Sequence, residues 1–335
     1  MKRCCVVAVM LLTLGILLVS SQQVNATGYY EGKTITIIVG YGPGGGYDRV
    51  ARLLAKHLPK HIPGKPTVLV ENMPGADSMI ATNYLYNIAK PDGLTIGTFN
   101  RGMSFAQLLK AQGVRFDVTK FAWIGSAAVE SATFAIRADM PYKTFAEARK
   151  AKSPLMVGST GPADSNGQFS LLLKEYLGLP MKMINYPSGA DVQLAIERKE
   201  LDGMSRSYSS LKLLIDRGIL RPLIRCSVAL PENEKLPVDE SLASNNTAKT
   251  VMSMRSAPDR VGRPYVAPPK TPPEAMKVLK DAFAKVEKDP ELLLDAAKMM
   301  EDVKYVPPEE VLRVLNGLLS QPPEMVKEFS RFIKF

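Results

Sequence analysis

The sequence predicts an α/β protein of two lobes, each built on a mostly parallel sheet flanked by helices. From Thr34 onward, short apolar runs alternate with amphipathic stretches, and strands that alternate with helices form parallel sheets. The loops that follow the runs are rich in small residues, and the same order of strand, loop and helix resumes in the middle of the chain. The 335 residues are enough for two domains of about 150 residues each.

The first 26 residues predict a secretory signal. Lys2 and Arg3 precede an apolar run from Val6 to Val19, and small residues close the segment at Ala26. The run is shorter than the roughly 20 residues of a membrane-spanning helix. We therefore expect export and cleavage after Ala26, the alternative being an uncleaved N-terminal anchor.

Cysteine usage and charge narrow the class of protein. Cys4 and Cys5 lie in the expected leader, so only Cys226 remains after cleavage. A lone cysteine closes no disulfide within the chain, and we interpret it as buried apolar filler. The formal net charge of +10 at pH 7 favours anionic partners. Nucleic acid is not expected, because the basic residues are spread along the chain without a cluster.

The periodicity of apolar residues predicts where the strands and helices lie. Strands are predicted at 35–39, 67–70 and 95–99 in the first lobe, and at 155–157, 183–184 and 203–204 in the second. In the first helix, Val50, Leu53, Leu54 and His57 share one face, so His57 is interpreted as a packing residue, and Asp48 is the expected N-cap. No metal site is expected at His61, which has no other ligand type beside it in the sequence.

The predicted division of the mature chain is lobe 1 over 27–130, lobe 2 over 131–258, and a return to lobe 1 over 259–335. The first crossing is expected at 127–133. Prolines between Pro264 and Pro273 are expected to mark the return crossing. Trp123, the only tryptophan, stands just before the first crossing, so we expect its surroundings to change when the lobes move.

The candidate site lies in the loops after the strands. The stretch GYGPGGGYDR, Gly40 to Arg49, joins a strand to a helix, and glycines there bring bare N–H groups to a helix N-terminus, which attracts anions. Arg101 and Arg206 are each expected in a loop just past a strand, where arginine pairs with a carboxylate, the alternative being a surface ion pair. The candidate ligand-binding residues are Gly42, Gly44, Gly45, Gly46, Asp48, Ala76, Asp77, Asn100, Arg101, Ser159, Thr160, Gly161, Asn166, Tyr186, Ser188, Gly189 and Arg206.

A dinucleotide-dependent enzyme is the main alternative. Gly40 to Gly45 satisfies the pattern G-x-G-x-x-G, and Glu71 ends the second strand where a ribose-binding acid would stand. An exported protein, however, meets little nicotinamide cofactor. The chain also contains no G-x-S-x-G, H-E-x-x-H or C-x-x-C sequence. We therefore expect neither catalysis nor a cofactor.

An ordered set of short motifs resembles one known family. They are Pro43 to Gly46 with Asp48, Val70 to Asn72 with Pro74 to Ala76, Pro91 to Gly93, Ser159 to Gly161, Tyr186 and Pro187 with Gly189, Leu201 to Gly203, and Val266 to Pro268 with Thr271 and Pro272. Together they resemble the tripartite tricarboxylate transporter receptors, the Bug-type solute-binding proteins. The resemblance implies a two-lobed periplasmic binding protein with a type II-like fold.

The resemblance also implies a function. Such a receptor, which we expect to act as a monomer in the periplasm, closes on a small carboxylated solute and delivers it to the integral membrane subunits of a tripartite transporter. A sensor of the same solute for a membrane signalling partner is a second alternative. The sequence departs from the family at 100–102 and at 205–208, where Arg101 and Arg206 add cations. Two added cations indicate a ligand with more than one carboxylate.

Overall fold

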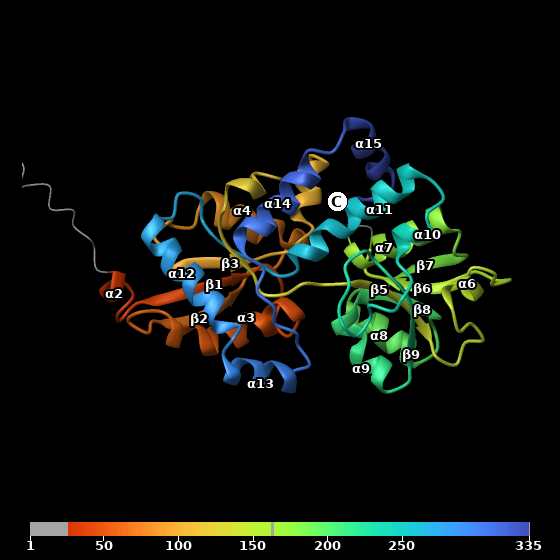
Figure 1. Ribbon diagram of the computed structural model, residues 1–335, viewed down its shortest axis with the longest axis horizontal. Helices are drawn as coiled ribbons and strands as arrows, with labels where there is room; N and C mark the ends of the chain where they lie inside the picture. Colours follow the sequence, from red (N-terminus) through yellow and green to blue (C-terminus); the bar gives the residue numbers. More distant parts are fainter. Residues whose placement is uncertain (1–25, 162–163, 335) are drawn as a thin grey trace, which may run out of the picture.

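The structure, a computed structural model, describes residues 26–161 and 164–334. The expected signal sequence lies outside the described residues, apart from Ala26. Figure 1 shows two lobes side by side, the left one coloured red to orange and blue, the right one yellow to cyan. In the described part of the chain, no helix has the length and apolar character needed to cross a membrane.

Lobe 1 is built on a five-stranded sheet in the order β2-β1-β3-β10-β4. Its strands are β1 (Thr34–Val39), β2 (Thr67–Asn72), β3 (Thr95–Thr98), β4 (Ala122–Ser126) and β10 (Pro264–Ala267). Strand β1 pairs in parallel with β2 and β3, whereas β10, from the returning chain, runs antiparallel to both β3 and β4. The mostly parallel sheet and its first three strands are thus confirmed.

Helices cover both faces of this sheet. They are α2 (Ala26–Tyr29), α3 (Gly46–His57), α4 (Met79–Asn87), α5 (Met103–Leu108), α12 (Pro273–Val286), α13 (Pro290–Lys298) and α14 (Pro308–Leu319). Ile37 of β1 packs in one core with α3 and α12, while the next residue, Ile38, packs in another with α4, α5 and α14. This alternation explains why the strand is a continuous apolar run, since both faces of a sheet flanked by helices are buried.

Lobe 2 repeats the plan in the order β7-β6-β8-β5-β9. Its strands are β5 (Ala132–Arg137), β6 (Leu155–Ser159), β7 (Met181–Asn185), β8 (Gly203–Ser207) and β9 (Leu220–Arg225), and its helices are α6 (Phe145–Ala148), α7 (Ser165–Leu177), α8 (Gly189–Glu197), α9 (Tyr208–Asp216), α10 (Asp239–Leu242) and α11 (Asn246–Val261). Strand β5 is the antiparallel member. Helices α7 and α11 share a core on one face, where α10 contacts both of them, and α8 and α9 pack on the other face.

Two crossings between the lobes run beside each other and are hydrogen-bonded. The N–H of Ala127 donates to the carbonyl of Arg263 over 3.0 Å, and the N–H of Glu130 donates to the carbonyl of Asp259 over 2.9 Å. The return crossing therefore precedes Pro264, which is already the first residue of β10. The prediction that the prolines mark the crossing was wrong, because those after β10 connect it to α12 within lobe 1.

The end of the chain also departs from the predicted division. Residues 259–335 were all assigned to lobe 1, but helix α15 (Pro323–Phe332) leaves that lobe and lies against α11 and α7, at the top right of Figure 1. Phe329 packs in the core of lobe 2, with its ring 5.0 Å from that of Phe105 in α5. An amphipathic pattern predicts such a helix but not the lobe that it covers.

The crossings allow a sharp stability test at Gly262, which follows α11. Its φ is +60°, and a Cβ there would lie 1.8 Å from the carbonyl oxygen of Ala128 in the neighbouring crossing. We expect Gly262→Ala to lower the free energy of unfolding by more than about 2 kcal/mol. As a control, Gly317→Ala in α14, where a Cβ meets nothing within 4 Å, raises it by about 0.5–1 kcal/mol. Urea unfolding checks both, and similar effects of the two changes would contradict the packing of the crossings.

Candidate functional site

A cleft of about 540 Å³ lies between loops of both lobes. Parallel strands present their carboxyl ends at one edge, so loops that follow different strands meet there. Of the candidate residues from the sequence, the structure brings these to the cleft: Gly42, Gly45, Gly46, Asp77, Asn100, Arg101, Thr160, Asn166, Ser188, Gly189 and Arg206.

Six other candidates lie within two residues of the lining residues along the chain but do not line the cleft: Gly44, Asp48, Ala76, Ser159, Gly161 and Tyr186. Ser159 lines a small cavity of about 30 Å³ that shares residues with the cleft. Asp48 lies in the first turn of α3, whose N-cap is Gly45, so its predicted capping position was wrong. Its carboxylate instead accepts from the N–H of Gly44 over 2.8 Å and from the amide of Asn72 over 2.9 Å. Asp48 therefore stabilises the conformation of the glycine loop without lining the cleft.

Several lining residues were not predicted from the sequence: Tyr41, Pro43, Tyr47, Glu130, Asp164, Ser165, Pro187, Ser207, Ser210 and Arg263. Most neighbour a candidate along the chain and could have been found by extending the loops. Glu130 and Arg263 could not, because they belong to the two crossings, whose place beside the cleft is a property of the fold.

Four helices begin at the cleft. Helix α3 starts at Gly46 with no side chain capping it, and α7, α8 and α9 start beside Asp164, Ser188 and Ser207. The first N–H groups of a helix have no partner within the helix, and each N-terminus carries about half a positive charge. Asp164 and Ser188 accept from one N–H group each at the starts of α7 and α8. The cleft is therefore electrostatically suited to an anion before any charged side chain is counted.

Arg101 is already paired with a carboxylate of the chain itself. Its Nε donates to Asp259 over 2.8 Å, and both side chains are buried. Asp259 also accepts from Arg255 over 2.8 Å, and the Nε of Arg255 donates to the carbonyl of Ser165 at the start of α7 over 2.9 Å. Burial opposes the charge of Arg101, but Asp259 outweighs it and raises the pKa of the guanidinium. This chain of contacts links the two lobes through α11.

Arg263 is neutralised in the same way. Its guanidinium lies 3.1 Å from a carboxylate oxygen of Glu130 and 2.6 Å from one of Glu301. Arg49 also pairs with Glu301. Two of the three arginines that line the cleft thus have internal counter-charges.

Arg206 is the exception. It lies within β8, not in the loop after it, which corrects the predicted position. Its Nη1 donates to the carbonyl of Gly189 over 2.9 Å, and among the described residues no carboxylate lies within ion-pair distance. Burial lowers the pKa of this guanidinium, although the more distant Asp164 opposes the shift. A partly buried cation without a counter-ion is stabilised by an anion that enters the cleft.

Gly189 lies directly against this cation. A Cβ on Gly189 would lie 2.1 and 2.4 Å from the two terminal nitrogens of the Arg206 guanidinium and 2.7 Å from its central carbon. The absence of a side chain at Gly189, the first residue of α8, therefore leaves room for the guanidinium in this position.

On the lobe 1 side, Asp77 stands in a strained turn. Ala76, Asp77 and Ser78 all have positive φ, at 45°, 50° and 79°. Such left-handed backbone is unfavourable for residues other than glycine, and less so for Asp and Asn. Strain of this kind is concentrated at functional sites. The carboxylate accepts from the hydroxyl of Tyr41 over 2.9 Å and from the amide of Asn100 over 2.5 Å.

The residues expected of other site types lie elsewhere. Glu71 is exposed on the edge strand β2 and does not line the cleft. His57, Asp289 and Glu291 come close enough to hold a metal ion, but the ammonium of Lys60 contacts both carboxylates at 2.5 and 2.9 Å. His57 itself is buried and lies 3.0 Å from Asp295. These groups join α13 and its N-cap to α3 and the turn that follows it through ion pairs.

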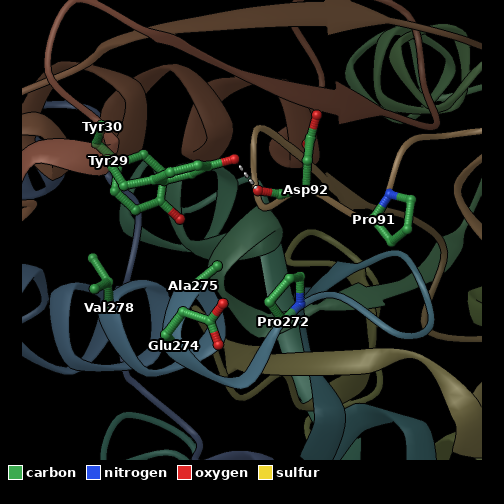
Figure 2. A pocket seen from close by; sticks show the side chains of 8 residues that line it. All are labelled: Tyr29, Tyr30, Pro91, Asp92, Pro272, Glu274, Ala275 and Val278. Carbon is green, nitrogen blue, oxygen red and sulfur yellow. Dashed lines mark hydrogen bonds between the residues drawn. The ribbon is translucent and has the colours of Figure 1, made fainter. Parts of the chain in front are cut away.

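A second cavity, of about 300 Å³, opens on lobe 1 between α2 and α12. Figure 2 shows its lining, in which the hydroxyl of Tyr29 donates to the backbone carbonyl of Asp92 over 2.6 Å. The side chains around it are aromatic, aliphatic or acidic: Tyr29, Tyr30, Pro91, Asp92, Pro272, Glu274, Ala275 and Val278. With two carboxylates and no cation among these residues, the cavity is unsuited to an anion.

Two α/β lobes joined by crossings, with a polar cleft between them, form the architecture in which periplasmic binding proteins close around a ligand. A model of the family described as tripartite tricarboxylate transporter family receptor matches residues 50–316. The chain belongs to this family.

Individual relatives agree with this assignment. A UPF0065 protein of Bordetella pertussis is 27% identical over 259 residues, which cover 76% of each chain. The periplasmic binding protein BugD has a similar structure, with a TM-score of 0.68 and 22% identity over 90% of this chain and 98% of that one. MatC from Rhodopseudomonas palustris, solved with bound malate, is also similar in structure. Its TM-score is 0.64, and it is 18% identical over 90% of this chain and 99% of that one. The two solved structures show the likeness of fold.

The Asp259 contacts generate a prediction. Asp259→Asn leaves the buried Arg101 and Arg255 without a full counter-charge, so we expect the free energy of unfolding to fall by about 3–5 kcal/mol. Asp281→Asn, at an exposed pair with Lys277, is the control and changes it by less than about 0.5 kcal/mol. Chemical denaturation measures both, and a loss below 1 kcal/mol in Asp259→Asn would contradict a structural role.

The pH dependence of the folding stability follows from the carboxyl group of Asp259. Burial opposes ionisation of Asp259, but Arg255 and Arg101 outweigh it and lower its pKa below the ordinary value of 3.8. A lowered carboxyl pKa stabilises the fold above the unfolded value of about 4, and this contribution is lost as the pH falls through the folded value. Acidification below pH 4 should therefore destabilise the parent more than Asp259→Asn.

Proposed function

We propose that this protein is a periplasmic receptor that captures a small carboxylated solute between its lobes and delivers it to the membrane subunits of a tripartite transporter. One observation carries the proposal: Arg206, the cation of the described cleft without an internal counter-charge, stands among the N-termini of four helices. Family membership supports the partner, and the malate bound by MatC supports the class of solute.

The ion pairs in the cleft do not support the expectation that the solute carries several carboxylates. That expectation counted Arg101 and Arg206 as two available cations. Because Arg101 is paired with Asp259, the cleft offers one available guanidinium. We therefore propose that one carboxylate of the solute binds at Arg206, assisted by hydroxyl and N–H donors beside Ser188 and Ser207.

Binding without catalysis is part of the proposal. The residue types most used for proton transfer and nucleophilic attack lie away from the cleft: His57 and His61 contact α13, and Cys226 is buried in the core of lobe 2. Burial raises the pKa of the Cys226 thiol to about 12, so it is a poor nucleophile. Export, with the mature chain beginning at Thr27, completes the proposed route to the periplasm.

Removal of Arg206 tests the proposal. Loss of a charged hydrogen-bond donor in a partly buried site weakens binding by about 1.5–3 kcal/mol, so we expect Arg206→Ala to lower carboxylate affinity about ten- to a hundredfold. The unfolding midpoint should change little. Arg217→Ala, at an exposed pair with Glu197, serves as the control. A carboxylate panel measured by calorimetry decides, and unchanged affinity in Arg206→Ala would make this arginine a structural residue.

Closure of the lobes is the second test. The loops of one lobe cannot enclose a small solute alone, so binding should reduce the radius of gyration in small-angle scattering. Trp123 should not report this motion, because it is buried within lobe 1 and its Nε1 donates to the carbonyl of Val118 over 2.8 Å. A ligand at a hundredfold excess over its Kd should stabilise the fold by about 2.7 kcal/mol. Stabilisation without compaction would contradict closure, and stabilisation by dinucleotides alone would favour the enzyme alternative.

A further inference from the structure

We propose that the solute is an amino carboxylate, whose ammonium group binds at Asp77 in lobe 1 while its carboxylate binds at Arg206 in lobe 2. This inference rests on the proposed function, since it takes a carboxylate at Arg206 as given. It adds the chemistry of the opposite wall of the cleft and makes Asp77 the residue that selects the solute.

The charged groups of the cleft are divided between the lobes in a way that suits a dipolar ligand. Lobe 2 contributes Arg206, which lacks a counter-ion. On the lobe 1 side, Arg101 and Arg263 are ion-paired, whereas the carboxylate of Asp77 has no cationic partner within the described chain. Its donors are two neutral groups, the Tyr41 hydroxyl and the Asn100 amide. One wall thus presents an unpaired cation and the other an unpaired carboxylate.

A second solute carboxylate would be unfavourable at this wall. Burial raises the pKa of Asp77, and the carboxylate of Asp164 in the facing lobe raises it further, against the hydrogen bonds from Tyr41 and Asn100. An added anion would increase this repulsion. An ammonium group instead donates three hydrogen bonds and carries the compensating charge, while an ionised carboxylate donates none.

The backbone holds Asp77 in this position. The left-handed turn over 76–78 fixes the direction of the side chain, and the hydroxyl of Ser78 donates to the carbonyl of Gly40 over 3.0 Å. Gly40 approaches so closely that a Cβ there would lie 2.4 Å from the Ser78 oxygen. The turn is therefore fixed to the end of β1, and Asp77 is oriented before the solute arrives.

The test compares solutes that share a carbon skeleton and differ in one group. Four trios each contain an amino, a hydroxy and an unsubstituted acid: alanine, lactate and propionate; aspartate, malate and succinate; glutamate, 2-hydroxyglutarate and glutarate; phenylalanine, phenyllactate and phenylpropionate. By calorimetry on the mature protein at pH 7, we expect the amino member of at least one trio to bind at least tenfold more tightly than both companions.

Substitution of Asp77 then tests whether this residue causes the preference for the amino acid member of a trio. Asp77→Asn tolerates the left-handed backbone and keeps an acceptor for Tyr41, and it should remove the preference while affinity for the unsubstituted acid stays within about threefold. Asp281→Asn is the control, because its carboxylate forms an exposed pair with Lys277 and does not line the cleft. It should change the preference by less than threefold. Unfolding midpoints verify that both variants fold.

The pH dependence of binding is a second measurement of the role of Asp77. As the pH is lowered from 7, protonation of Asp77 should weaken binding of the amino member before that of the unsubstituted acid, and this difference should disappear in Asp77→Asn. Equal affinity for hydroxy and amino members, or an unchanged preference in Asp77→Asn, overturns the ammonium site and leaves the carboxylate receptor intact. Failure of the parent to bind any of the twelve compounds contradicts the proposed function itself.

Discussion

The carboxylate of Asp259 is the contact on which the arrangement of the cleft depends. It lies in the helix that crosses between the lobes and neutralises Arg101 from the first lobe and Arg255, which in turn reaches the start of α7 in the second. Buried ion pairs contribute little net stability, but removal of one member leaves a charge that has lost both water and its partner. The position of the cleft loops is therefore tied to the presence of this carboxylate.

The same carboxylate decides which cations are left for a ligand. Arginine is the natural partner for a carboxylate, so an arginine near a binding loop is easily taken for a ligand-binding residue. In this molecule Arg101 and Arg263 serve the junction between the lobes, and Arg206, at first sight an ordinary strand residue, remains without a counter-ion. Function in the cleft thus depends on which charges the fold leaves uncompensated.

Local patterns in the sequence predicted the α/β class, most strands and the loops that meet at the cleft, because hydrophobic periodicity and glycine-rich turns are local properties. They could not predict the partner of Arg101, since Asp259 is 158 residues away along the chain. They also missed Glu130 and Arg263, and the lobe on which α15 packs. Each of these depends on how distant segments approach in space, which no single stretch of sequence determines.

The left-handed turn at Ala76, Asp77 and Ser78 limits how the receptor could diversify. At position 77, backbone with positive φ favours glycine, asparagine and aspartate over other residues. Asparagine and aspartate differ in charge and hydrogen bonding but hardly in bulk, whereas glycine removes the side chain altogether. Evolution at this wall can therefore change the polarity of the solute in single steps, whereas a change in solute size has to come from the other loops.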